Sequence, residues 1–187
     1  MSDRPLPPYT HIPGVTPHPI SDPAGHSYGL HPSIAVDTAA ADAPLIWENL
    51  IEHPEFQWAV TLFNAGYYWE SHEAWESLWH QAGRTGLLAD YLKGLIKLAA
   101  AGVKLREHNL AGFERHARRA QELLMESRMS SFDGEIPRVS IFARKLSSLA
   151  THLVRQPPQL PDDRTGRPVA ALPRLPWSTV DPPENED

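Results

Sequence analysis

The distribution of proline sets the strongest limit on how this chain can fold. Of nineteen prolines, nine lie in residues 1–44 and eight in residues 156–187, so only Pro54 and Pro137 remain between these tails. Proline fixes φ and has no backbone N–H, so closely spaced prolines are incompatible with a helix or a central strand. We therefore expect a single folded domain over residues 45–155, between two extended, flexible tails.

The charges divide along the same boundaries. Residues 45–155 carry thirteen Lys/Arg and thirteen Asp/Glu, so the net charge of −6 belongs to the two tails. Proteins that bind DNA or RNA need clustered basic side chains to neutralise phosphates. A neutral domain with acidic tails therefore predicts no nucleic-acid partner.

The composition also bears on the compartment. The chain has no cysteine, so it has no disulfide or thiolate metal site, which is typical of a reducing environment. The amino-terminal stretch "MSDRPLPPYTHIPG" lacks the basic and apolar regions of a secretory signal. The most apolar stretch, residues 87–105, carries Asp90, Lys93, Lys97 and Lys104, and such charges are costly inside a bilayer. We expect a soluble cytoplasmic protein without a membrane partner.

The domain reads as helical throughout, because its apolar residues recur at spacings of three and four. The expected helices cover residues 45–53, 55–65, 67–82, 86–107, 110–128 and 137–155. Gly66 and the Asp133-Gly134 pair mark turns, Asn109 suits an N-cap, and Pro137 suits a first helical position. The short links predict an all-α fold, a compact array of about five or six antiparallel helices. Gly94 and Gly102, inside the central helix 86–107, predict close approach of neighbouring helices.

The helix 67–82 has the most unusual sequence, "YYWESHEAWESLWH". A helical period places one buried stripe on it, comprising Tyr68, Ser71, His72, Trp75, Leu78, Trp79 and Ala82. Glu76 falls on the edge of the stripe beside Trp69 and should be half buried, whereas Glu70 and Glu73 should point to solvent. We therefore predict a polar cluster of His72 and Glu76, completed by a lysine or by Asn64 and wedged between tryptophans.

Two stretches, "FNAGYYWESHEAWESLWH" and "YLKGLIKLAAAGVKLREHNLAGFERHARRAQELL", together resemble the helical family known as domain of unknown function 309. The resemblance covers about residues 56–125, and it rests on the spacing of the Asn, Gly, Tyr, His-Glu and Trp-Glu residues of the first stretch. It implies a single all-helical domain with no established activity. The family commonly has glutamine where this chain has Lys93 and Lys97.

A metal site is one hypothesis for the polar cluster. His72-Glu73-x-x-Glu76 resembles a zinc-protease HExxH motif with glutamate in the last position, so His72 and Glu76 are candidate ligands of a divalent metal. Asn64, His80 or His108 would have to supply a third ligand. Lysines facing the cluster would repel a cation. We therefore expect no cofactor, with His72 satisfied by Glu76 inside the protein.

Acid–base catalysis is a second hypothesis. Glu76, His72, Glu73 and Glu70 are the candidate catalytic residues, because a partly buried carboxyl beside an imidazole can exchange protons with a substrate. Lys93 or Lys97 would hold an anionic substrate. This would be a hydrolase or lyase, and no nucleophile triad, phosphate loop or dinucleotide fingerprint accompanies it.

The first expectation for function is a binding or structural role. Trp69, Trp75 and Trp79 could line a face for a peptide or a second copy of the chain, since tryptophan is enriched at interfaces. The candidate ligand-binding residues are Asn64, Trp69, Trp79, Lys93 and Lys97. The partner would be a peptide, another protein or a second subunit.

The tails carry two further features. Four histidines, His11, His18, His26 and His31, are irregularly spaced, so specific metal binding is not expected of them. The stretches "PPQLP" and "PRLPW" could present short polyproline segments to a partner, although a terminal linker is the simpler interpretation.

Overall fold

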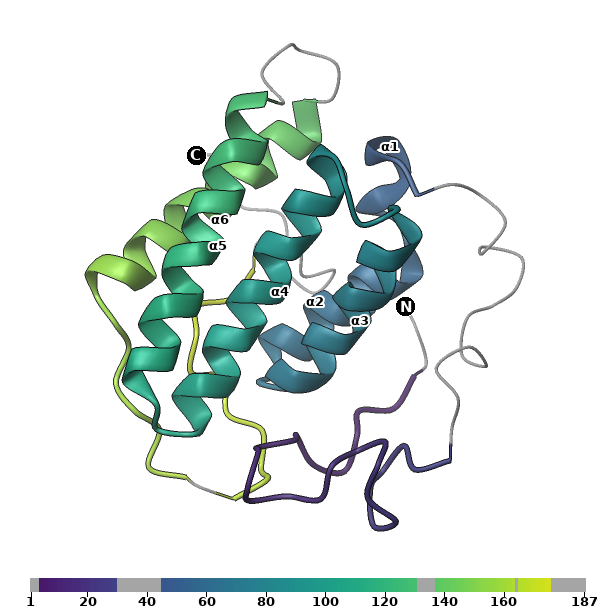
Figure 1. Cartoon of the computed structure of the whole chain (residues 1–187), viewed down its shortest axis with the longest axis vertical. Helices are drawn as coiled ribbons and strands as arrows, with labels where there is room; N and C mark the ends of the chain where they lie inside the picture. Colours follow the sequence, from purple (N-terminus) through teal and green to yellow (C-terminus); the bar gives the residue numbers. More distant parts are fainter. Residues whose placement is uncertain (1–3, 30–44, 131–136, 164, 176–187) are drawn as a thin grey trace, which may run out of the picture.

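A computed structural model describes residues 4–29, 45–130, 137–163 and 165–175 of the chain. Its six helices are α1 (Trp47–Leu50), α2 (Pro54–Asn64), α3 (Tyr68–Gln81), α4 (Leu87–Arg106), α5 (Leu110–Ser130) and α6 (Pro137–Arg155). No strand occurs in these described ranges, so the all-α prediction is confirmed. Figure 1 shows a compact array in which, from α2 to α6, each helix packs beside the next.

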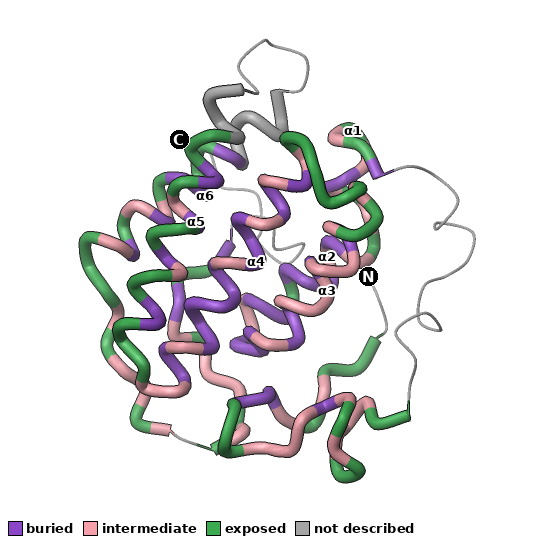
Figure 2. Tube along the Cα trace, viewed as in Figure 1, coloured by how far each residue is buried: buried purple, intermediate pink, exposed green. Residues whose placement is uncertain are grey.

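Helix α4 lies in the middle of the array, between the α2–α3 pair and the α5–α6 pair (Figure 1). Most of its length is buried, as the purple course of its trace in Figure 2 shows. Apolar side chains cover two arcs of this helix, so it can pack against α3 on one side and α5 on the other. The expectation of a central helix is thereby confirmed.

The helix boundaries follow local chemistry. Gly66 ends the α2 segment with a φ of +88°, a left-handed conformation that favours glycine. Before α5, the Asn109 Oδ1 accepts a hydrogen bond of 2.8 Å from the Gly112 N–H, as expected of an N-cap. Pro137 is the first residue of α6, as predicted. The predicted Asp133-Gly134 turn lies outside the described residues.

Helix α1 is shorter than predicted, with Trp47–Leu50 in place of residues 45–53. Proline at the first position of α2 disfavours a helical conformation in the residue before it, and His53 has an extended ψ of 126°. The His53 side chain instead accepts a hydrogen bond from the Glu55 N–H and caps α2. One continuous helix across Pro54 is thereby excluded.

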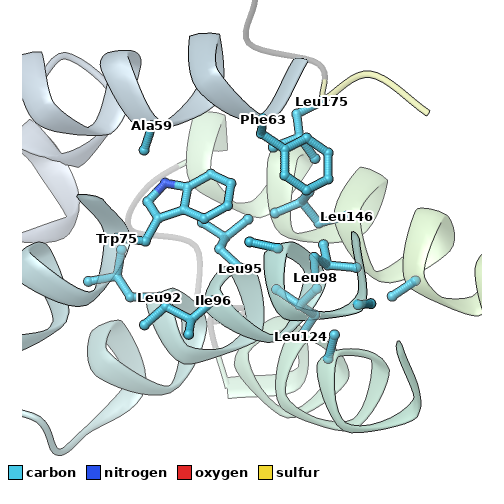
Figure 3. Packing of buried hydrophobic residues seen from close by; sticks show 14 of the residues in the cluster. Ala59, Phe63, Trp75, Leu92, Leu95, Ile96, Leu98, Leu124, Leu146 and Leu175 are labelled. Atoms are coloured by element: carbon cyan, nitrogen blue, oxygen red, sulfur yellow. The ribbon is translucent and has the colours of Figure 1, made fainter. Parts of the chain in front are cut away.

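The core is rich in aromatic rings. Trp75 is fully buried, and Figure 3 shows its indole between Ala59 of α2 and Leu92 and Leu95 of α4. The fully buried side chains of largest volume are those of Trp75, Tyr68, Tyr91, Phe56, Phe63 and Phe113. Burial of such large apolar surfaces provides most of the favourable free energy of folding.

The described parts of both proline-rich segments lie against the helices. Ile12 is 1% exposed in the first segment, and Leu172 and Leu175 are 5% and 1% exposed in the second. The two segments also meet, because the Thr10 N–H donates a hydrogen bond of 2.9 Å to the Gly166 carbonyl. Figure 1 shows no helix in either described segment, and the amino-terminal one crosses below the helices in this view. The expectation of flexible tails did not include these contacts.

The structure also bears on membrane insertion. Among the described residues, none of the helices combines the length and the apolar character that a membrane span requires.

Candidate functional site

The orientation of α3 is fixed by a buried stripe that matches much of the predicted one. Tyr68, Ser71, Trp75 and Leu78 are each at most 1% exposed. The Ser71 hydroxyl donates a 2.8 Å hydrogen bond to the Ala59 carbonyl of α2. His72, predicted to lie inside the stripe, instead lies on its border with residues 73 and 76, within reach of solvent.

His72, Glu73 and Glu76 form a compact group on this border. Each offers one ligand atom, and the three atoms all lie within 4.8 Å of one another. His72 Nε2 is 3.8 Å from Glu76 Oε2, and the two side chains are 26% and 42% exposed. The group is therefore open at the protein surface and is not sealed in the core.

The charges around this group are unbalanced. Burial, more than the nearby Lys97, lowers the pKa of His72, while Glu76 and the Ile96 backbone act in the opposite direction. Burial and the neighbouring Glu76 and Glu70 raise the pKa of Glu73 from 4.5 to about 7. The site thus offers a neutral imidazole beside carboxylates that repel one another.

The structure corrects the predicted roles of two glutamates. Glu73 was expected to point to solvent, yet it is half-buried and its carboxylate belongs to the group. Glu76 is half-buried as predicted, with a side chain that is 42% exposed, so the second correction concerns Glu70. The helical wheel assumed one buried face, whereas α3 is covered on a second face by the amino-terminal segment.

Glu70 corrects the same prediction further. It is 8% exposed, and its two carboxylate oxygens accept hydrogen bonds of 2.7 Å from the Thr10 hydroxyl and 2.8 Å from the His11 N–H. His26 Nε2 lies 3.4 Å from the same carboxylate. Glu70 therefore binds the amino-terminal segment and does not face solvent as the wheel predicted.

The predicted ligand-binding residues Asn64 and Trp69 also contact the segments outside the helices. The Asn64 side chain pairs with the backbone of Leu175, so it does not join His72 and Glu76 as predicted. The Trp69 ring packs edge-on against the His11 and His18 rings, with both centroid separations at 5.2 Å. Nothing in the sequence of α3 signals these contacts, because the partners lie 50 or more residues away.

The two lysines differ in their surroundings. Lys93 Nζ lies 6.0 Å from the centre of the Trp79 ring, in a cation–π arrangement. Lys97 instead acts electrostatically on His72 and on His116 of α5. Burial, followed by the positive charges of Lys97, Arg115 and Lys104, lowers the pKa of His116. His116 was not among the predicted site residues, because only the packing of α5 on α4 brings it near.

The two histidines proposed as a third ligand lie elsewhere. His80 is exposed at the end of α3, where its ring packs on Trp79. His108 Nε2 is 2.8 Å from the Pro161 carbonyl. The third potential ligand beside His72 and Glu76 is instead Glu73.

The fold and site define a class: an all-α domain of packed helical hairpins that carries a surface His/Glu group on one helix. Residues 56–116 match the model of a family described as Domain of unknown function (DUF309), which confirms the resemblance seen in the sequence. The matched stretch covers about a third of the chain; it begins in α2, ends in α5 and contains the His/Glu group. Comparison with curated proteins and with solved structures gave no match.

Proposed function

We propose that this domain is a binding domain and that its ligand is a divalent cation held by His72, Glu73 and Glu76. The observation that carries the proposal is the approach of three ligand atoms to within 4.8 Å of one another. Nitrogen and oxygen ligands bind zinc at about 2.0–2.2 Å, so small side-chain rotations would close this group around an ion.

The electrostatics of the group support the same proposal. Metal ions bind the neutral imidazole, and burial favours that form of His72. The pKa of Glu73 is raised by burial and by two other carboxylates, so a cation would relieve a repulsion already present. Lys93, expected to oppose a cation, lies over the Trp79 ring.

The ligand set indicates which ions to test. One imidazole and two carboxylates suit zinc, manganese or ferrous iron better than calcium, which prefers oxygen ligands alone. All three ligands come from one helix and the group is open to solvent. Further coordination positions would therefore be available to water or to a second ligand.

Isothermal titration of chelator-treated protein with Mn²⁺ and Zn²⁺ tests the proposal. We expect one site per chain in the wild type. Glu73→Gln should lose at least tenfold in affinity, because the neutral amide lacks the negative charge of the carboxylate. Glu114→Gln, an exposed substitution on α5, is the matched control and should bind like the wild type. Equal affinity in wild type and Glu73→Gln would overturn the assignment.

A second candidate function is metal-assisted hydrolysis or a lyase reaction on a small anionic substrate. The observation that favours it is the position of Lys97 beside His72, which places positive charge next to the proposed cation. Metal-dependent turnover in a screen of phosphate and carboxylate esters, lost in a folded Glu76→Gln variant, would support this candidate. Turnover retained in that variant would rule out this site as its source.

A further inference from the structure

The carboxy-terminal segment 165–175 is bound through its backbone by side chains of the helices. The Leu175 N–H donates a 2.7 Å hydrogen bond to Asn64 Oδ1, and Asn64 Nδ2 donates one of 3.3 Å to the Leu175 carbonyl. Three residues earlier, the Leu172 N–H donates a 2.8 Å hydrogen bond to the Tyr68 hydroxyl. Two helical side chains thus bind two backbone positions of an extended chain.

The same two positions insert their side chains into the core. Leu172 and Leu175 are almost completely buried, whereas Pro173 and Arg174 between them are exposed. Figure 3 shows Leu175 beside Phe63 of α2. Backbone hydrogen bonds combined with two buried side chains are how many proteins bind extended peptides.

Gly66, between α2 and α3, allows this close approach. A Cβ at this position would lie 2.5 Å from the carbonyl carbon of Val169, a distance that only the absence of a side chain permits. The glycine φ of +88° also turns the chain so that Asn64 and Tyr68 face the same segment. We name Asn64, Gly66 and Tyr68 the α2–α3 corner.

Arg106, at the end of α4, extends this contact to earlier residues. Its Nη2 donates hydrogen bonds of 2.9 Å to the carbonyls of both Thr165 and Arg167, and its side chain is 1% exposed. Its Nε and Nη1 are buried, and within the described part of the chain they have no hydrogen-bond partner. The segment thus accepts hydrogen bonds from one of the three guanidinium nitrogens, Nη2, and from neither of the other two.

We propose that the α2–α3 corner, together with Arg106, is a recognition site for an extended peptide of the form Leu-Pro-x-Leu. Residues 172–175 of this chain are then a displaceable ligand bound in cis. The corner lies within the family match at residues 56–116, while the segment lies outside it. Proline after the first leucine fits this role, because it favours an extended backbone and needs no hydrogen-bond acceptor. The proposal is independent of the cation site.

The test compares full-length variants in trans binding of a fluorescent peptide that carries residues 166–175. Leu172→Ser with Leu175→Ser weakens the cis segment and leaves the corner intact. We expect this double variant to bind the peptide saturably, at least tenfold more tightly than the wild type does. Adding Asn64→Ala to the double variant should lower its affinity for the peptide about tenfold, because both hydrogen bonds to one peptide residue are lost. Thr61→Ala, an exposed substitution on α2, is the matched control and should change nothing.

Three outcomes would overturn the proposal. One is a folded double variant that binds no peptide, and another is equal binding of a peptide with serine at both leucine positions. Loss of helical circular dichroism in the double variant would also count against it, because the segment would then be part of the core and could not be displaced. Hydrogen exchange of the wild type gives an independent measurement. The amides of Leu172 and Leu175 should exchange at least tenfold faster than those of the α4 core, and equal protection would contradict displacement.

Discussion

At the residue scale, the surroundings of Glu73 differ from those of an ordinary buried carboxyl. A buried carboxyl on a helix is normally satisfied by hydrogen-bond donors, and Glu70 shows this arrangement with Thr10 and His11. The neighbours that act on Glu73 are instead other carboxylates, so its ionised form is held at a cost in folding free energy. This property makes the position useful for binding a cation.

The raised pKa of Glu73 predicts a pH dependence with a definite sign. The native state binds this proton up to about pH 7, whereas the unfolded chain releases it near its ordinary value of 4.5. The wild type should therefore lose stability relative to Glu73→Gln as the pH rises from 4.5 to 7, with no further change above. Urea unfolding of both proteins with chelator at pH 4.5, 6 and 8 measures this difference.

Two results would support or contradict this reading of Glu73. Because Glu73 and Glu76 interact, the pH at the midpoint of this change in stability reflects the titration of both carboxyls together. Adding Mn²⁺ should restore the wild type at pH 8 and leave Glu73→Gln unchanged. A stability difference that stays constant over this range of pH would show that the Glu73 carboxyl is not perturbed.

At the scale of elements, two glycines determine how closely α4 approaches its neighbours. A Cβ at Gly102 would lie 2.5 Å from the Tyr68 ring of α3, and a Cβ at Gly94 would lie 2.8 Å from the Leu124 side chain of α5. The two contacts differ in how readily they can adjust. Tyr68 is fixed by its hydrogen bond to Leu172 and by the Phe63 ring, while the end of a leucine side chain can rotate.

This difference predicts unequal effects of two matched substitutions. Gly102→Ala should lower the free energy of unfolding by about 1–2 kcal/mol, because overpacking a fixed ring outweighs the gain of about 1 kcal/mol in helix propensity. Gly94→Ala should cost less than Gly102→Ala, because a buried leucine side chain can shift more readily than a ring held by a hydrogen bond. Urea unfolding of both variants measures the difference, and a Gly102→Ala variant as stable as Gly94→Ala would contradict this account of the packing.

At the scale of the whole molecule, the helices bind both proline-rich segments by side chains that belong to the family match. Glu70 and Tyr67 bind the amino-terminal segment, with the Tyr67 hydroxyl donating a 2.9 Å hydrogen bond to the Pro7 carbonyl. Asn64 and Tyr68 bind the carboxy-terminal segment. The motif around α3 therefore carries both the His/Glu group and the side chains that hold these segments.

The hydrogen bonds of Glu70 predict a loss of stability when its charge is removed. Glu70→Gln replaces one carboxylate oxygen by an amide group that cannot accept from Thr10 or His11, and hydrogen bonds to charged groups contribute about 1.5–3 kcal/mol. We expect the free energy of unfolding to fall by about 2 kcal/mol and the His11 amide to lose protection from hydrogen exchange. Glu114→Gln is the control, and an unchanged His11 amide in Glu70→Gln would show that this carboxylate does not hold the segment.

The helical architecture and one face of α3 follow from local sequence pattern. Apolar spacing, the Asn109 cap and Pro137 are local signals, and they act through the backbone of a few neighbouring residues. The stripe of Tyr68, Ser71, Trp75 and Leu78 could be predicted for the same reason. His72 and Glu76 could be paired because a single turn of helix brings them together.

Which glutamates are buried, and what binds them, depends on contacts between distant parts of the chain. A helical wheel assigns faces from apolar residues, so it placed Glu70 and Glu73 in solvent. In the folded chain, a segment from about 60 positions away covers Glu70 with donors. Proline content predicts that such a segment is extended, but its contacts depend on side chains distant in sequence. That distance is why the fold could be predicted from local pattern and the surroundings of the site could not.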